Sequence, residues 1–232
     1  MTALEPTPAF AQLSFDRNSL LAALSEAPGP ARFESCDFSG ADLHGIDLRE
    51  ASFAGCRFAE TDFSGAVLSG SRWRDCRASL AVFQAVDLSD ARFWCCDLNN
   101  TQWRGARLAS ALFTEVKLTG AVFREVQGLG LSFHDCLMVG ADLQGHSFRK
   151  QQIEKLDLSD ADLGGCDFRD AVFVGGSLRN ASLKNARFDG ADLRTVDLAG
   201  LRITAVAQLL KGAIVSADQA AEFLRDLGVR VH

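Results

Sequence analysis

The sequence predicts an all-β solenoid built from five-residue units, and three observations support this fold class. From Phe33 to Ile203 the residue numbers ending in 3 or 8 form 35 consecutive slots, of which 14 hold Phe and 14 hold Leu. The position two residues before each slot is usually small, with Ala at 15 places and Cys at six. A period of five matches neither the roughly 3.6 residues of an α-helical turn nor the alternation of a β-strand. The constant period therefore indicates a repeat, in which each unit fills one apolar slot, called position i below.

Individual units identify the kind of repeat. The units ADLHG, ADLQG and ADLGG, which begin at residues 41, 141 and 161, resemble the A(D/N)LXX pattern of the pentapeptide repeat family. The resemblance covers residues 31–205 and implies a right-handed quadrilateral β-helix. In that fold one unit forms one side, four units form a coil, and positions i and i−2 both point inward. The 35 units then correspond to about nine coils, stacked at roughly 4.8 Å.

The cysteines test the coil size independently. Five of them occupy position i−2 and are separated by multiples of twenty: Cys36, Cys56, Cys76, Cys96 and Cys136. With four units per coil they form one column, interrupted at Val116, whereas another coil size would scatter them over several sides. We therefore interpret them as packed core residues and not as a metal site or a disulfide framework. Cys95 is expected to point outward, where it is a candidate reactive thiol.

Three positions depart from the pattern. Ala78 is a small residue in an apolar slot, and the oversized Trp73 before it compensates for the lost volume. Gly128 is followed by Leu131 at an i−2 position, so we expect a local distortion of the backbone over residues 126–131. His146 also occupies an i−2 position, where we expect a buried, hydrogen-bonded side chain.

The sequence divides into three segments: an N-terminal extension and helical cap (residues 1–30), the repeats (31–205), and a last partial coil with a C-terminal helix and dimerisation module (206–232). A solenoid exposes an open core at each end, so caps are expected. Residues 16–27 predict a short helix with Asp16 or Asn18 as N-cap, and the first dozen residues are expected to be loose.

The C-terminal segment has its own signals. Leu210 and Val215 are expected to finish the last partial coil. Ser216 and Gln219 form a capping box that starts a helix over residues 217–227, and Gly228 suits the position just after it.

A narrower resemblance concerns this same end. The run QLLKGAIVSADQAAEFLRDLGVRV, residues 208–231, is similar to the C-terminal module of the quinolone-resistance (Qnr) pentapeptide repeat proteins. The resemblance implies a C2 homodimer that mimics B-form DNA, binds DNA gyrase or topoisomerase IV, and modulates or protects the enzyme against poisons such as quinolones. It places four residues at the dimer interface: Phe223, Leu224, Leu227 and Val229. The alternative is that the helix only caps its own coil.

The charge distribution bears on DNA mimicry. The chain carries a net charge of −6, and residues 156–205 hold eight acidic and six basic residues. The candidate partner-binding residues are the aspartates of this zone and one outward aromatic residue: Asp157, Asp162, Asp167, Asp192, Asp197 and Trp94. An equally physical interpretation is that Asp at i−1 hydrogen-bonds the backbone at the corners. The second function that the sequence allows is a non-enzymatic scaffold for some other protein partner.

Several classes of function are not expected. The sequence shows no nucleophile–base pairing and no phosphate-binding loop, and a filled core leaves no substrate pocket. We therefore expect no enzyme activity, no cofactor, no metal and no small-molecule substrate, and no direct binding of nucleic acid. The N-terminus lacks the features of a signal peptide, and no apolar run approaches the length of a membrane span, so a cytoplasmic protein is expected.

Overall fold

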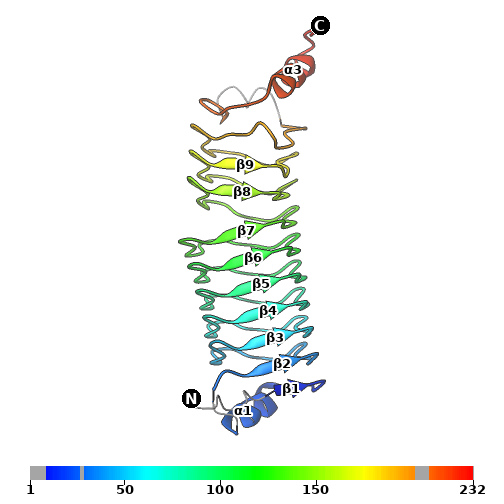
Figure 1. Ribbon diagram of the computed structural model, residues 1–232, viewed down its shortest axis with the longest axis vertical. Coiled ribbons are helices and arrows are strands. Elements are labelled where there is room, and N and C mark those ends of the chain that lie inside the picture. The colour runs from blue at the N-terminus through cyan, green and yellow to red at the C-terminus, as the bar shows by residue number, and fades with distance from the viewer. Residues whose placement is uncertain (1–8, 27–28, 202–208, 232) are drawn as a thin grey trace, which may run out of the picture. The chain divides into compact units, whose positions relative to one another are not determined.

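The computed structural model describes residues 9–26, 29–201 and 209–231, and it confirms the all-β solenoid (Figure 1). The chain forms two compact units, Met1–Ser132 and Phe133–His232. Parallel strands of the first unit follow one another along one side: β1 (Ala9–Ala11), β2 (Arg32–Glu34), β3 (Ser52–Ala54), β4 (Arg72–Arg74), β5 (Arg92–Trp94) and β6 (Leu112–Thr114). Strand β7 (Ser132–His134) begins at the last residue of the first unit, and β8 (Gln152–Glu154) and β9 (Val172–Val174) belong to the second unit.

Four units make one coil, as predicted. Successive strands pair with a register of twenty residues, for example Phe33 with Phe53 in the first unit and Ile153 with Phe173 in the second. The other three sides are joined by single parallel bridges with the same register, such as the one between Asp42 and Asp62. Each five-residue unit therefore forms one side of a four-sided coil.

The apolar slots fill the interior of each unit. From residue 33 to residue 198, every position i other than Gly128 is at most 5% exposed. Aromatic rings stack between coils, with centroids 5.2 Å apart for Phe33 and Phe53, and meet edge to face within a coil, as Phe53 and Phe58 do at 87°. Both geometries are favourable for aromatic pairs, at about 0.5–1.5 kcal/mol each beyond the burial of area. The last predicted slot, Ile203, lies outside the described residues.

The corner residue at i+2 explains a second sequence preference. Among the described residues, many glycines and 20 non-glycine residues have positive φ, and examples at the corners are Asn100 at 58° and Asp160 at 57°. The left-handed conformation costs an ordinary L-residue about 1–2 kcal/mol, and Asn, Asp and especially Gly tolerate it best. The frequent Gly, Asp and Asn at i+2 are therefore a consequence of corner geometry.

The first coil begins earlier than the sequence predicts. Strand β1 pairs in parallel with β2, and Phe10 and Phe15 stack on Phe33 and Phe38 at 5.2 and 5.3 Å. The expectation that the first dozen residues are loose is therefore wrong for residues 9–12. The signal was present, because Phe10 and Phe15 are themselves five residues apart.

Helix α1 (Arg17–Ser25) replaces two of the four sides of this first coil. Asp16 is its N-cap, as predicted, and forms a capping box with Ser19. Leu20 is fully buried, and Arg17 Nη1 donates to the carbonyl of His44 at 2.7 Å, which ties the helix to the next coil. The helix therefore covers part of the open end of the first unit, as expected for a cap.

The C-terminal end continues the ladder and then changes to helix. Ile214 donates to Ala191 O and accepts from Leu193 N, both at 2.8 Å, so the ladder extends to residue 214, and the predicted Leu210 and Val215 are half-buried. Helix α3 (Ala217–Asp226) starts with the predicted capping box of Ser216 and Gln219. Gly228 has φ 80°, and the amides of residues 228 and 229 donate back to the last helical turn, as in a Schellman motif. Neither helix in the described ranges has the length and apolar character to cross a bilayer.

The expected distortion over residues 126–131 is small: among the described residues Val126 lacks the turn hydrogen bond that Ala66 and Ala106 donate to the carbonyl three residues before, but the register of the ladder is kept. The bridge between Arg107 and Gln127 and the turn hydrogen bond from Leu131 N to Gly128 O are both kept. Two local effects remain: Val126 is only half-buried, and Leu129 is 88% exposed. The hydrogen-bonded ladder thus holds the register although one core side chain is missing.

Gly176 provides a test of the close approach between coils. It has φ 88°, and a Cβ added there would overlap the carbonyl oxygen of Leu156 and lie 2.9 Å from its amide nitrogen. We expect Gly176→Ala to lower the free energy of unfolding by roughly 3 kcal/mol, because the backbone must move. The matched control Gly140→Ala has φ 65° but open space around it, so it should lose only about 1 kcal/mol. Urea unfolding followed by circular dichroism measures both, and equal losses would contradict the close approach.

Candidate partner-binding surfaces

The aspartates at i−1 act in the turns of the coil. All twelve accept a hydrogen bond from the backbone N–H two residues later, at 2.8–3.3 Å. Such local bonds stabilise the corner, so each aspartate has a structural role whatever else it does. The five candidate partner-binding aspartates belong to this set.

Two of those five carboxylates are neutralised by an arginine of their own turn. Arg169 donates to Asp167 and Arg194 to Asp192, each with a closest distance of 2.6 Å. The charge-assisted hydrogen bonds from Arg169 lower the pKa of Asp167 to about 2, and those from Arg194 lower the pKa of Asp192. A partner would meet an ion pair at these positions and not a free carboxylate.

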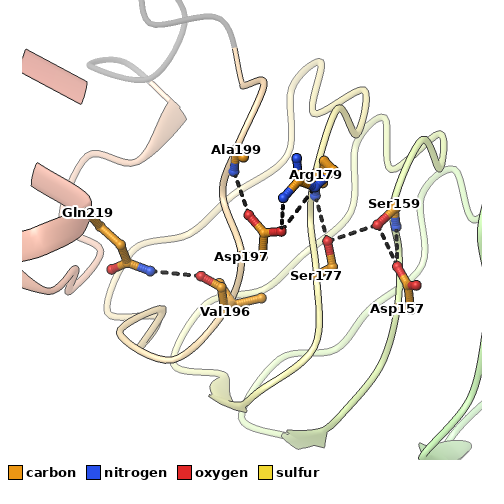
Figure 2. A network of polar contacts seen from close by, with 8 residues as sticks. All are labelled: Asp157, Ser159, Ser177, Arg179, Val196, Asp197, Ala199 and Gln219. Atoms are coloured by element: carbon orange, nitrogen blue, oxygen red, sulfur yellow. Dashed lines mark hydrogen bonds and ion pairs between the residues drawn. The ribbon is translucent and has the colours of Figure 1, made fainter. Parts of the chain in front are cut away.

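Two others lie in a polar network along one side of the second unit (Figure 2). Ser159 Oγ lies 2.5 Å from Asp157 and 2.8 Å from Ser177 Oγ, and one coil further Arg179 donates to Asp197 at 2.7 Å. Asp197 also accepts from the Ala199 amide at 2.9 Å. The network links three successive coils, so these carboxylates stabilise coil stacking as well as their own turns.

The candidate aspartates do not form one acidic face. The ladder runs from Asp157 through Ser177 to Asp197, which places these two on one side. Asp162, Asp167 and Asp192 belong to the ladders of the other three sides. Asp162 also accepts from Gln144 Nε2 at 2.5 Å. Carboxylates are thus distributed around all four sides of the second unit.

The C-terminal apolar residues are exposed in the single chain. Leu224, Leu227 and Val229 are 43%, 59% and 47% exposed, and Phe223 is partly buried. Gln219 fixes the helix that carries them, because its Nε2 donates to the carbonyls of Leu193 and Val196, both at 2.8 Å. Figure 2 shows the contact with Val196. Gln219 belongs to the run that is similar to the Qnr module, and its physical role is to dock α3 onto the last coil.

Trp94 points outward on β5, as predicted, and is 47% exposed. In the parallel ladder its direct neighbour on β4 is Arg74. Trp94 belongs to the first unit, whereas the five candidate aspartates belong to the second.

The candidate binding residues predicted from the sequence did not include the arginines on β2, β4 and β5. Arg32, Arg72 and Arg92 all occupy position i−1 on the side that carries Trp94. The sequence contains a signal for them, because these arginines are separated by multiples of twenty residues, as the cysteines of the core column are.

The cysteines behave as core residues. Among the described residues no group of three or more His, Cys, Asp or Glu side chains could hold a metal ion, and all seven cysteines are free. Burial raises the pKa of Cys166 to about 12. Desolvation and a hydrogen bond to Glu115 raise the pKa of the outward Cys95, which disfavours the reactive thiolate.

His146 is buried, as predicted, at 7% exposure, and its ring packs edge to face on Phe148 at 4.6 Å. The expected hydrogen bond is not found at Nε2, which is buried without a partner among the described residues. Burial lowers the pKa of His146 to about 4, because the charged form would be desolvated.

Sequence profiles place the chain in a family. A profile described as pentapeptide repeat region matches residues 30–103 and 48–123, and one described as pentapeptide repeats (8 copies) matches residues 132–170 and 161–200. The chain belongs to the pentapeptide repeat family. No curated protein sequence matches it.

Solved structures of pentapeptide repeat proteins share its fold. Trypsin-treated QnrB1, a plasmid-mediated fluoroquinolone resistance protein, matches with a TM-score of 0.58 and 21% identity over 97% of this chain and 99% of that chain. Full-length QnrB1 matches with a TM-score of 0.58 and 20% identity over 95% and 100%. HetL, involved in heterocyst differentiation regulation in the cyanobacterium Nostoc sp. strain PCC 7120, matches with a TM-score of 0.50 and 20% identity over 87% and 97%.

The buried histidine generates a prediction about acid stability. The folded-state pKa of about 4 lies below the ordinary value of 6.5, so on acidification the unfolded chain takes up a proton before the folded one does. The free energy of unfolding therefore decreases by up to about 3 kcal/mol as the pH falls from 6.5 through 4. His146→Leu should remove this part of the pH dependence, whereas the exposed control His44→Gln should keep it. Urea unfolding at several pH values measures the slopes, and parallel curves for the wild type and His146→Leu would contradict the assignment.

Proposed function

We propose that this protein is a non-enzymatic, cytoplasmic homodimer that binds DNA gyrase or topoisomerase IV as a DNA mimic and modulates or protects the enzyme against poisons such as quinolones. The observation that carries the proposal is the set of exposed apolar residues on a helix fixed to the last coil. The fold similarity to QnrB1, over nearly the whole length of both chains, supports it.

The C-terminal residues suit a symmetric interface. Burial of exposed leucine surface contributes about 25 cal/mol per Å² removed from water. Leu224 lies in the last turn of α3, Leu227 is its C-cap residue, and Val229 completes the Schellman motif by donating to the carbonyl of Leu224. Because Gln219 and the capping box hold the helix in place, little conformational entropy is lost when a second copy docks.

The distribution of carboxylates around the second unit supports DNA mimicry, but the pairing of several of them with arginines argues against it. Duplex DNA carries charge around its whole circumference, and the second unit has aspartates on all four sides. However, Asp167, Asp192 and Asp197 each pair with an arginine. This pairing favours the second candidate function, a non-enzymatic scaffold that binds another protein partner.

The dimer is testable by sedimentation. We expect the wild type to sediment as a dimer and Leu224→Glu/Leu227→Glu to sediment as a monomer, because two carboxylates cannot be buried unpaired in the interface. The matched control, Leu80→Glu, changes a leucine that is 53% exposed in the first unit and should leave the dimer intact. A wild type that is monomeric at all concentrations would show that α3 only caps its own coil.

Topoisomerase binding is testable with purified DNA gyrase. We expect the wild type to inhibit supercoiling or to protect gyrase from ciprofloxacin, and the monomeric Leu224→Glu/Leu227→Glu variant to need at least about tenfold more protein, because half of the mimic is lost. The Leu80→Glu control should match the wild type. A dimer that neither binds gyrase nor changes its activity would leave the scaffold function as the better assignment.

A further inference from the structure

A groove lies on the outer face of strands β2 to β5, in the first unit. It encloses about 1000 Å³, and its lining includes Arg32, Arg72, Arg74 and Arg92, together with Ser52 and Ala54 of β3. Ser52 and Ala54 are the smallest outward residues on these four strands, so β3 is recessed between the long side chains of β2 and β4. We call this feature the arginine groove.

Two arginines of the groove lack the carboxylate partners that several other arginines of the chain have. Arg49, Arg169 and Arg194 each bind the aspartate two residues earlier in their own turn. Among the described residues, by contrast, neither Arg32 nor Arg72 forms an ion pair or a side-chain hydrogen bond.

The other two arginines are only partly satisfied. Arg92 donates to the carbonyl of Ser110 at 2.6 Å, and Arg74 lies 3.6 Å from Asp75. The guanidinium groups therefore keep donors available for an anionic ligand.

Two of these charges are placed against each other. Arg72 on β4 and Arg92 on β5 are direct partners in the parallel ladder, where strands lie about 4.8 Å apart. Like charges at directly opposed positions destabilise a sheet. This pair of like charges does not stabilise the sheet, but it presents two neighbouring guanidinium groups that suit a carboxylate of a partner.

Trp94 extends the same surface. It is the direct ladder neighbour of Arg74, and at 47% exposure it offers an aromatic face next to the arginines. Exposed tryptophan and arginine side chains together are the residues most enriched at the energetic centres of protein interfaces.

The acidic residues around the groove distinguish a protein partner from a nucleic acid. Glu34, Glu50 and Asp90 also line it, and the whole chain has a net charge of −6. A continuous row of phosphates would meet these carboxylates and the repulsive field of the chain. A protein segment can place single carboxylates on the arginines and leave neutral or basic residues beside the acidic rim.

We infer that the arginine groove binds an acidic segment of a protein partner, with carboxylates on Arg72 and Arg92 and an aromatic side chain against Trp94. The binding is independent of the proposed action on a topoisomerase and uses a different surface from the C-terminal helix.

A direct binding experiment tests this inference. The probe is a short fluorescein-labelled peptide in which two glutamate and two phenylalanine residues are separated by neutral residues, and anisotropy measures its affinity at low and physiological salt. We expect Arg72→Gln/Arg92→Gln to weaken binding about tenfold or more, because charge-assisted hydrogen bonds are lost. The matched control Arg104→Gln/Arg107→Gln removes the same charge from arginines paired with Glu125 and Asp87, and should weaken binding less than about twofold.

Tryptophan fluorescence locates the bound peptide without a mutation. Of the three tryptophans, Trp73 and Trp103 are at most 1% exposed, so acrylamide quenching reports chiefly on Trp94. We expect the unlabelled peptide to protect the fluorescence from quenching. The inference would be overturned by no binding at low salt, by equal weakening in both double variants, by unchanged quenching, or by tighter binding of a single-stranded thymidine oligonucleotide of equal charge.

Discussion

Nearly every five-residue side closes with a corner residue in the left-handed conformation, Thr195 being the exception among the described repeats, and the rest of the coil depends on that corner. The corner turns the chain so that positions i and i−2 both point inward, which is why one is bulky and the other small. Asp at i−1 supports the same turn through the backbone N–H of i+1, as all twelve examples show. Stacking of rings such as Phe38 and Phe58, with centroids 4.8 Å apart, then joins one closed coil to the next.

The corner geometry also limits where function can reside. Only i−1, i+1 and i+2 face outward, and i−1 is often occupied by an aspartate that the turn needs. Acidity alone is therefore a weak indicator of a binding site in this fold, as the pairing of Asp192 with Arg194 illustrates. Outward residues that the coil does not need are more informative. Leu227 at the end of α3 and Arg72 on β4 are of that kind, since among the described residues neither has a partner that explains its exposure.

The register, the coil size and both helical caps could be predicted because each rests on a signal repeated along the chain or on local capping chemistry. Individual side-chain contacts could not, since they depend on which atoms meet after folding. The indole N–H groups of Trp73 and Trp103 are satisfied by Ser71 and Thr101, at 2.9 and 2.8 Å, although the sequence shows only small residues at i−2. The unpartnered Nε2 of His146 and the arginine column were missed for the same reason. The proposed dimer residues and the candidate aspartates remain predictions.

The two terminal coils show how tolerant this architecture is of altered spacing. The register is 23 residues between Phe10 and Phe33, with α1 in place of two sides, and 22 residues between Asp192 and Ile214. A coil can thus be lengthened where its path leaves the regular turn, provided that the strands rejoin the ladder. Homology searches tuned to an unbroken frame will truncate such proteins at both ends. Protein engineers can use the same places to graft helices or recognition loops onto a rigid support.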